Sequence, residues 1–398
     1  MKLKDILEGC LFTDGDWIES KDQDANGDIR LIQLSDIGDG YFVNKSKKFI
    51  NEETARKLRC TFLRKDDILI ARMPDPLGRA CLFPFEENNK YITAVDVCIL
   101  RPNDKCNNRY LQYCLNSPEI RSIINRQKTG TTRERITRKK LGELEIPFPS
   151  LKVQQKIVDI LDTADILRLN NKTLLIKYDT LAQSIFLEMF GDPVKNEKGW
   201  KLENLKKITS KIGSGSTPSG GKDAYHEEGI SLIRSLNIHD NFFKMKDLAF
   251  IDERQANKLK NVSLEKNDVL INITGASVAR STIVPDELLP ARVNQHVSIL
   301  RPKSSILNSV FLLHLLISPN SKAKLLGVSS QGGATREAIT KDQLENFEII
   351  LPSIALQKQF AEKIALIEQQ KELAKQELKE SEDLFNCLLQ KAFKGELV

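Results

Sequence analysis

Two stretches of this sequence decide the fold: TRERITRKKLGELEIPFPSLKVQ at residues 132–154 and TREAITKDQLENFEIILPSIALQ at residues 335–357. Of their 23 aligned positions, 11 are identical, including the opening Thr-Arg-Glu and the Pro-Ser near the end. The separation of about 200 residues is far longer than the period of a solenoid repeat. The chain of 398 residues is therefore predicted to contain one domain twice.

Shorter matches occur in the same order at similar offsets. They pair Asp67-Ile-Leu-Ile with Asp268-Val-Leu-Ile, Ile99-Leu-Arg-Pro102 with Ile299-Leu-Arg-Pro302, and Ser117-Pro118 with Ser318-Pro319. Because the order is collinear, the whole unit is repeated and not one motif alone.

The first part of each unit has the pattern of an α+β domain. Short β-branched runs bounded by Gly, Pro, Asn and Asp predict strands, and two apolar segments around the Ser-Pro pair predict helices. The predicted strands are 68–71, 97–100, 144–148, 269–273, 297–300 and 347–351, and the predicted helices are 110–116, 118–126, 310–317 and 320–326. Ser117 is predicted to cap the second helix, with Pro118 at its first position.

The second part of each unit is predicted to be one long helix. Apolar residues recur at heptad spacing from Val153 onward and again from Phe360 onward, which is a coiled-coil signal. Each helix could pack on its own domain, but two such helices at matching places favour pairing with each other. The predicted seam consists of Ile157, Ile160, Leu167, Asn171, Leu174, Leu181, Phe360, Ile364, Ile367, Leu378 and Phe385, and Lys371 and Ser381 interrupt it.

These patterns divide the chain into four parts. We expect a globular domain at 1–150, a central helix at 151–190, a second globular domain at 191–355 and a C-terminal helix at 356–398. Within the second domain, residues 191–200 form a polar linker that begins with Gly191-Asp192-Pro193.

Composition excludes several classes of protein. With 40% hydrophobic and 29% charged residues the chain is globular, and its apolar runs are too short to span a bilayer. The start MKLKDILEGC has no apolar signal region and the seven cysteines form no CxxC pair, so we expect a cytoplasmic protein with reduced thiols. The net charge of +6 lies in the two globular parts, which permits a nucleic-acid partner.

Catalytic motifs are absent from the sequence. The segment KIGSGSTPSGGKD at 211–223 looks like a phosphate loop, but Ser216 replaces the first required glycine and Asp223 follows Lys222 where Ser or Thr is needed. There is no GxSxG elbow, no dinucleotide GxGxxG, no methylase motif and no metal-ligand spacing. We therefore expect a binding protein without catalytic or metal-ligating residues.

A basic stretch marks the candidate contact with nucleic acid. Residues 121–140 hold eight Lys or Arg and one acid, Glu134, and both units carry Thr-Arg before their final strand. Amides, hydroxyls and guanidiniums all suit phosphate, although a solvated helix face would show the same charges. The predicted phosphate or framework contacts are Thr132, Arg133, Arg135, Lys139, Thr335, Arg336 and Lys341.

Positions that are identical in both units cannot distinguish two different sequences. Base readout is therefore predicted in loops that differ between the units, where Arg can read guanine and Gln can read adenine. The candidates are Arg72, Asp75, Arg79, Thr274, Ser277, Arg280 and Gln295.

These features together resemble a known family. The domain–helix–domain–helix order, the closing TRxxIT…PS…Q motif, SIFLEMFGDP at 184–193 and LQKAFKGEL at 389–397 are similar to the specificity (S) subunit of type I restriction–modification enzymes. The first unit departs from the pattern in lacking a counterpart of the GSGSTPS loop. The resemblance implies two target recognition domains, separated by helices that pair as an antiparallel coiled coil.

The resemblance also implies partners and function. It implies that the chain reads an asymmetric bipartite target in double-stranded DNA and docks two methyltransferase subunits and restriction (translocase–endonuclease) subunits. S-adenosylmethionine, ATP and Mg²⁺ are then expected on those partners and no cofactor on this chain. The alternatives are a coiled-coil adaptor that binds only proteins and an enzyme whose motifs are not visible.

Overall fold

The computed structural model describes residues 1–397 except 75, 131–132, 218–223 and 331–337. It divides into two compact units, each made of one globular part and portions of both long helices. Unit 1 comprises Met1–Lys172 and Gln376–Val398, and unit 2 comprises Thr173–Lys375. No helix in the described residues is both long and apolar enough to cross a membrane.

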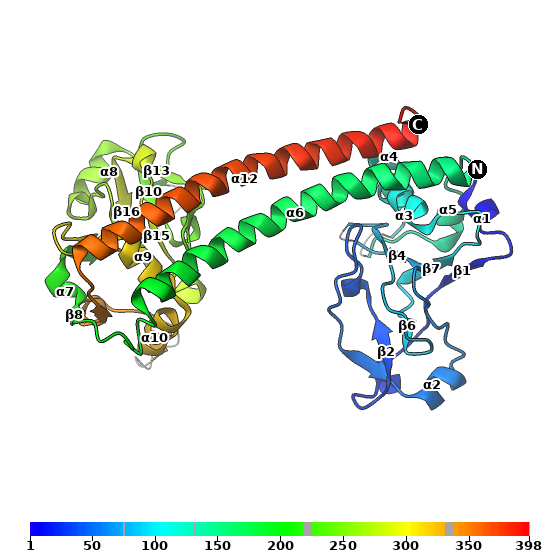
Figure 1. The fold of residues 1–398 in the computed structure, drawn as a ribbon, viewed down its shortest axis with the longest axis horizontal. Coiled ribbons are helices and arrows are strands. Elements are labelled where there is room, and N and C mark those ends of the chain that lie inside the picture. The colour runs from blue at the N-terminus through cyan, green and yellow to red at the C-terminus, as the bar shows by residue number, and fades with distance from the viewer. Residues whose placement is uncertain (75, 131–132, 218–223, 331–337, 398) are drawn as a thin grey trace. The chain divides into compact units, whose positions relative to one another are not determined.

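Unit 1 contains two small sheets (Figure 1). The first is antiparallel, with its strands in the order β1-β7-β4-β5. The second has the order β3-β2-β6, in which β2 and β6 are parallel. The strands are β1 (Leu11–Asp14), β2 (Ile29–Ile32), β3 (Lys48–Ile50), β4 (Ile68–Ala71), β5 (Ala80–Leu82), β6 (Tyr91–Thr93) and β7 (Val97–Arg101).

Unit 2 repeats both sheets. The order β9-β17-β14-β15 corresponds to β1-β7-β4-β5, and β13-β10-β16 corresponds to β3-β2-β6. It adds two short strand pairs, β18-β8 and β11-β12. The strands are β8 (Leu202–Asn204), β9 (Thr209–Ser214), β10 (Ile230–Ile233), β11 (Ile238–His239), β12 (Phe242–Phe243), β13 (Ala249–Ile251), β14 (Val269–Asn272), β15 (Ser281–Ile283), β16 (Ala291–Val293), β17 (Val297–Pro302) and β18 (Glu348–Ile350).

Helices pack beside these sheets at matching places. α3 (Asn108–Asn116) and α4 (Pro118–Arg126) correspond to α9 (Ser309–Ile317) and α10 (Pro319–Ser330). Ser117 caps α4 by accepting a hydrogen bond from the Ile120 amide, as predicted. The short helices are α1 (Leu3–Ile6), α2 (Glu52–Lys57), α5 (Arg138–Gly142), α7 (Leu205–Ile208), α8 (Glu253–Lys258) and α11 (Lys341–Glu345).

An internal ion pair explains why two of the sequence matches recur together. Arg101 on β7 donates two hydrogen bonds of 2.7 Å to the fully buried Asp67. In unit 2, Arg301 on β17 binds Asp268 in the same way, at 2.7 and 2.8 Å. A bidentate pair joins the loop before one strand to the neighbouring strand, so loss of the arginine would leave a buried carboxylate without its ionic partner.

A buried glutamine joins each globular part to the long helix that follows it. Gln154 accepts a hydrogen bond from the Asn107 amide at 2.9 Å and donates to the Pro149 carbonyl. Gln357 makes the equivalent bonds to the Asn308 amide and the Pro352 carbonyl, both at 2.8 Å. This shared geometry accounts for the glutamine that closes both copies of the motif.

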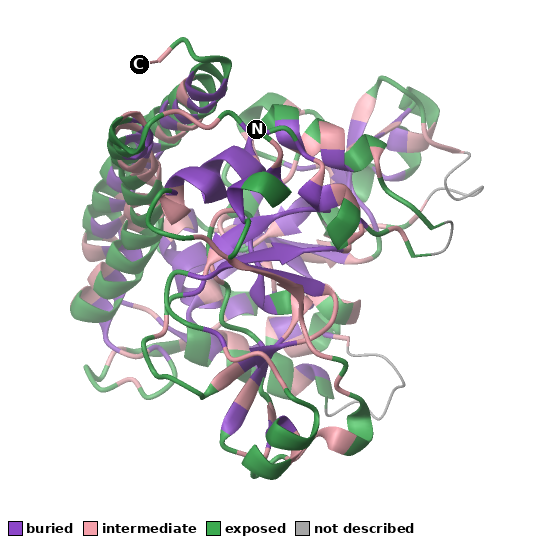
Figure 2. Ribbon diagram, turned by 90° about the vertical axis from the view of Figure 1, so that its right-hand side faces the viewer, coloured by how far each residue is buried: buried purple, intermediate pink, exposed green. Residues whose placement is uncertain are grey.

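The two long helices are α6 (Leu151–Phe190) and α12 (Ile354–Lys394). In unit 1, the beginning of α6 shares a core with the end of α12, through Ile157 and Leu161 on one helix and Phe385 and Leu389 on the other. In unit 2, Phe186 and Phe190 near the end of α6 share a core with Phe360 near the start of α12. The helices therefore run antiparallel, and each also packs on a globular part (Figure 2).

The predicted seam is confirmed on α12 but only in part on α6. Phe360, Ile364, Ile367 and Phe385 are buried and Leu378 is half-buried. On α6, Ile157 is buried, and Ile160, Leu174 and Asn171 are half-buried; the Asn171 amide lies 3.3 Å from the Ser381 hydroxyl.

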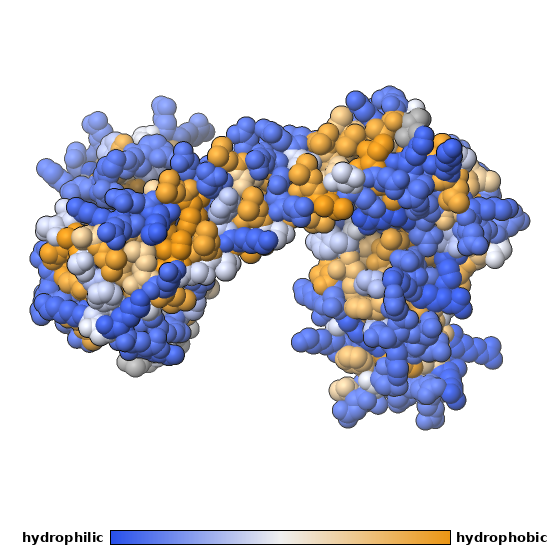
Figure 3. Space-filling model, in the orientation of Figure 1, coloured by the Kyte–Doolittle hydropathy of each residue, from blue (hydrophilic) through white to orange (hydrophobic). Residues whose placement is uncertain are grey.

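Leu167 and Leu181 were predicted wrongly, because 46% and 44% of their surfaces are exposed. Leu161 and Ala182 are buried, and each directly follows a predicted seam position, Ile160 and Leu181 respectively. Runs of adjacent apolar residues leave the heptad register of α6 ambiguous by one, and a small alanine at a close contact has no hydrophobic signal of its own. Hydrophobic residues consequently remain on the helix surface (Figure 3): Ile166, Leu167, Leu169, Ile176, Leu181, Leu366 and Leu373.

The predicted strand at 144–148 is also wrong. In unit 1 this segment makes a single bridge, between Glu145 and Lys2, whereas unit 2 forms β18 against β8. Pro147 has no amide proton to donate to a ladder, and unit 2 has Ile350 at that position.

Candidate nucleic-acid interface

A loop of the same backbone geometry follows β4 in unit 1 and β14 in unit 2. The Ala71 amide donates to the Arg79 carbonyl at 2.8 Å, and the Asn272 amide donates to the Arg280 carbonyl at 2.9 Å. The residue before each arginine, Gly78 or Ala279, has a positive φ of 77° or 66°. These paired main-chain bonds hold a loop whose side chains differ between the units.

The closing motif lies beside this loop in both units. The Ile136 amide donates to the Arg72 carbonyl at 3.0 Å, and the Ile339 amide donates to the Ile273 carbonyl at 2.8 Å. The structure thus brings the predicted framework segment next to the predicted reading loop. Thr132, Thr335, Arg336 and Asp75 lie outside the described residues.

A third segment completes the surface in each unit. The Arg72 amide donates to the Asp96 carbonyl, and the Ile273 amide donates to the His296 carbonyl at 3.0 Å. In unit 2 this contact brings Gln295, which is exposed, to the edge of the loop.

In unit 2 these segments enclose a concave site of about 590 Å³. Three of the four residues predicted to read bases in unit 2 line it, namely Thr274, Ser277 and Arg280. The fourth, Gln295, lies beside it with its amide nitrogen 3.3 Å from the His296 ring. Residues that are scattered over 22 positions of sequence therefore meet at one hollow.

Polar side chains in and beside this hollow contact one another. The Thr274 hydroxyl lies 2.6 Å from His296 Nδ1, and Arg280 Nη1 lies 3.5 Å from His239 Nδ1. Beneath the loop, the fully buried Asn272 donates to Ser235 and Ser277, and its Oδ1 has no partner among the described residues. The site thus presents hydroxyl, imidazole, guanidinium and amide groups, which are the groups that hydrogen-bond to base edges.

Sequence reasoning missed His296 and Ser235, which line this site, and His239, which contacts Arg280. A sequence signal existed for His296, which follows Gln295 directly. The other two reside on the segment around β11, and only the tertiary fold brings that segment to the loop.

In unit 1 the two arginines that were predicted to read bases face the protein. Arg79 is 7% exposed and donates to the carbonyls of Ile37, Leu34 and Pro76 at 2.5, 2.9 and 3.0 Å. Arg72 is 9% exposed, pairs with Asp14 at 2.7 Å and donates to the Ile136 carbonyl. Because these donors already bind protein acceptors, the geometry favours a structural role for both arginines over the predicted contact with bases.

In the basic stretch of unit 1, some side chains are exposed and others turn toward the protein. Arg133, Arg135 and Lys139 are exposed, as phosphate contacts require. Arg121 instead turns inward and donates to the Leu77 carbonyl, and burial lowers the pKa of its guanidinium. Lys140 donates to the Gln127 carbonyl at 2.7 Å.

Lys139 belongs to a shallow basic hollow. Lys4, Arg72 and Arg138 line the same hollow, which also contains the carboxylates of Asp14 and Glu143. Hydrogen bonds from Lys2 and Lys4 lower the pKa of Glu143 to about 2, so this acid stays ionised and paired at neutral pH.

In unit 2 the predicted contact Lys341 is exposed at the start of α11. Its ammonium lies 3.5 Å from Glu345, which also pairs with Lys206 at 2.8 Å. Such exposed pairs are weak, so Lys341 can exchange this partner for a phosphate at little cost.

Metal ligands do not cluster here: among the residues that the structure describes, no group of three or more His, Cys, Asp or Glu side chains could hold an ion.

A family model described as the type I restriction modification DNA specificity domain matches residues 1–177 and 197–382. The MjaIX type I restriction enzyme specificity subunit of Methanocaldococcus jannaschii is 24% identical over 352 residues, which cover 82% of this chain and 77% of that protein. The EcoBI specificity subunit of Escherichia coli is 26% identical over 325 residues, covering 74% and 66% of the two chains.

Two solved structures share the fold. One, from a study of complex assembly and conformational transition in the type I R-M system, has a TM-score of 0.60 at 20% identity and covers 100% of this chain and 97% of that chain. The S subunit of a type I restriction–modification system from M. genitalium has a TM-score of 0.53 at 17% identity, covering 99% and 95%.

Proposed function

Because this chain belongs to the family of type I restriction–modification specificity subunits, we propose that each of its two globular parts reads one half of a bipartite target in double-stranded DNA. The half-sites differ in sequence because the reading loops differ. The two domains at 1–150 and 191–355 are the target recognition domains of this proposal.

One observation carries the proposal: the two units hold different side chains on the same loop backbone. The main-chain bonds that fix the loop after β4 recur after β14, and so does the attachment of the closing motif. The side chains on those loops differ, with Arg72 opposite Ile273 and Gly78 opposite Ala279. A loop backbone that is the same in both units but carries different side chains suits the recognition of two different sequences.

The residues divide by role. Arg133, Arg135, Lys139 and Lys341 are exposed cations that contact phosphate, together with Thr132, Thr335 and Arg336 of the closing motifs. Thr274, Ser277, Arg280 and Gln295 contact base edges from the hollow of unit 2.

In this proposal the chain performs no catalytic step. It docks two methyltransferase subunits and restriction subunits, and S-adenosylmethionine, ATP and Mg²⁺ bind to those partners.

Exchange of one reading domain tests the proposal. Residues 1–150 are replaced by the first domain of another specificity subunit, and the methylated sequence is determined by methylation-sensitive sequencing in cells that contain the partner subunits. We expect one half-site to change while the other remains. The matched control exchanges residues 201–350 and should change the opposite half.

Two outcomes would contradict the proposal. If both half-sites change in either exchange, the domains do not read separately. If the complete complex retains no duplex DNA, the chain is a protein-binding adaptor.

A further inference from the structure

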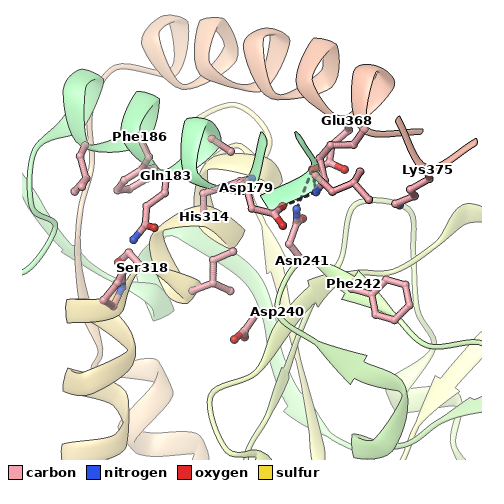
Figure 4. A pocket seen from close by; sticks show the side chains of 16 residues that line it. Asp179, Gln183, Phe186, Asp240, Asn241, Phe242, His314, Ser318, Glu368 and Lys375 are labelled. Atoms are coloured by element: carbon pink, nitrogen blue, oxygen red, sulfur yellow. Dashed lines mark hydrogen bonds and ion pairs between the residues drawn. The ribbon is translucent and has the colours of Figure 1, made fainter. Parts of the chain in front are cut away.

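Unit 2 contains a cavity whose counterpart in unit 1 is largely filled. The cavity has a volume of about 530 Å³ and lies between α6, α9, α12 and the β11–β12 turn (Figure 4). The corresponding space in unit 1, lined by the matching Asp39-Gly40-Tyr41 turn and by Tyr113, Arg168 and Phe385, measures about 160 Å³. A volume of 530 Å³ is within the range of small-molecule sites.

Substitutions between the repeats change the side chains that line this space. Tyr113 lies four residues before Ser117-Pro118, and His314 lies four residues before Ser318-Pro319. Phe385 lies eight residues before Phe393 on α12, and Ala182 lies eight residues before Phe190 on α6. Unit 2 therefore has alanine in place of the Phe385 ring and an imidazole in place of a phenol, while Phe186 stands at the position of Leu389.

In unit 1 the phenol is held by polar partners. The Tyr113 hydroxyl donates to Asp162 at 2.6 Å and accepts from Arg109 at 2.9 Å, and its ring lies 6.0 Å from that of Phe385. The same molecule thus shows which chemistry fills this space: aromatic rings, one of which carries a hydroxyl group.

His314 lines the cavity and has one polar atom that is buried without a partner in the described part of the chain. It is 7% exposed, its ring packs edge-on against Phe360, and its Nε2 has no hydrogen-bond partner among the described residues. Burial, reinforced by the charge of Lys371, lowers the pKa of His314 to about 4, so the ring is neutral at pH 7. A neutral imidazole can exchange one hydrogen bond with a hydroxyl group.

The remaining walls combine apolar and charged side chains. Ala182, Phe186 and Ile317 provide apolar surface. On the opposite side, Lys371 pairs with Asp179 at 2.7 Å and Glu368 at 3.0 Å, and the Asn241 amide donates to Glu368 (Figure 4). These charges satisfy one another, so the cavity favours an uncharged occupant.

We propose that this cavity binds a free, uncharged one-ring aromatic molecule with a hydroxyl group, which occupies the space that Phe385 fills in unit 1 and hydrogen-bonds to His314. A dry cavity of about 150 Å³ already holds benzene in an engineered protein, so the volume here is ample. The proposal does not depend on DNA binding.

Fluorine NMR titration of the full chain with 4-fluorophenol tests the proposal. We expect saturable binding that phenol competes for and cyclohexanol does not. Ala182→Phe restores the ring of unit 1 and should weaken binding at least tenfold, whereas Ser184→Phe, an exposed neighbour on α6 outside the cavity, should leave it unchanged. Absence of saturable binding, or equal affinity in Ala182→Phe, would overturn the proposal.

A second variant keeps the test valid if Ala182→Phe does not fold. His314→Phe should weaken 4-fluorophenol about tenfold, as expected for a hydrogen bond of about 1.4 kcal/mol, and leave fluorobenzene unaffected. An equal effect on both probes would exclude His314 as the polar partner. N-acetyl-tyrosinamide, which carries the same ring on a peptide, should bind at least tenfold more weakly than 4-fluorophenol, and tighter binding would show that the occupant is a side chain of a partner protein.

Discussion

The loops after β4 and β14 share a backbone but use their arginine differently. Arg79 donates to four backbone carbonyls of unit 1. Arg280 in unit 2 contacts the His239 ring at 3.5 Å, the one guanidinium contact found for it within the described parts of the chain. The same loop backbone can therefore hold its arginine in hydrogen bonds to the protein or leave it lining an open hollow. Sequence identity at a repeat position does not imply identity of role.

The largest expected effect comes from breaking the buried aspartate–arginine pair that recurs in both units. Asp268→Ala should lower the free energy of unfolding of unit 2 by about 3–5 kcal/mol, because the buried carboxylate accepts two hydrogen bonds from Arg301 and one from the Glu265 amide, and all three are lost. Urea unfolding followed by hydrogen exchange, read separately on peptides of each unit, measures the change. Asp286→Ala, which removes an exposed pair with Lys266, is the control and should cost at most about 1 kcal/mol. An equally small cost for both variants would show that the buried pair does not stabilise unit 2.

Removing the ring that fills unit 1 should make it resemble unit 2. Phe385→Ala should destabilise unit 1 by about 3–5 kcal/mol, because a buried aromatic ring leaves a cavity. Thermal and urea unfolding measure the loss. Leu384→Ala, at an exposed neighbour, should cost far less, and comparable losses would place the two side chains in similar surroundings.

The two arginines should separate stability from recognition. Arg79→Ala should cost about 2–3 kcal/mol through its lost carbonyl contacts, without a direct effect on base preference. Arg280→Ala should change stability by about 0.5 kcal/mol or less and relax the preference at one base pair. Binding-site selection with random duplexes, together with unfolding curves, reads both effects. A changed consensus in folded Arg79→Ala would return this residue to the base-reading set.

The arginines of the two closing motifs should act on affinity alone. Arg133→Ala should weaken DNA binding and reduce the salt slope of log affinity by about 0.9, because one phosphate contact is lost. Arg336→Ala should do the same in unit 2. Fluorescence anisotropy at several salt concentrations measures the slope, and an unchanged slope would exclude a phosphate contact.

The smallest effect concerns an acid that unit 2 lacks. Asp16 follows Gly15, and in unit 2 Ser216 follows Gly215. Burial raises the pKa of Asp16 from 3.8 to about 6, against the opposing hydrogen bond from the Thr61 amide. The stability that protonation provides is therefore present below pH 4 and lost as the pH rises through 6.

Asp16→Asn tests this pH dependence because the amide resembles the protonated acid. The variant should gain stability relative to the parent at pH 7 and gain none at pH 4. Thermal unfolding at both pH values makes the comparison, and a difference that does not vary with pH would show that Asp16 titrates normally.

The sequence predicted those parts of the fold that depend on local pattern. β4, α4 and the seam of α12 follow from strand composition, a Ser-Pro cap and a heptad pattern that Lys371 and Ser381 interrupt. The register of α6 was predicted only in part, because adjacent apolar residues make two stripes equally hydrophobic. The inward turn of Arg72 and Arg79 was not predictable either, because the carbonyl groups that receive them come from segments up to 64 residues away.

The shared helices have a consequence for synthesis on the ribosome. The core of unit 1 includes Phe385, Leu389 and Phe393, which are translated more than 200 residues after the rest of that core. At roughly 5–20 residues per second the first domain waits about 10–45 s for the segment that completes it. During that interval unit 2, whose residues 173–375 are contiguous, can fold first although it is made second. The nascent first domain then exposes the surface that residues 376–398 later cover, and a chain arrested before those residues would be recognised by the quality-control machinery through that surface.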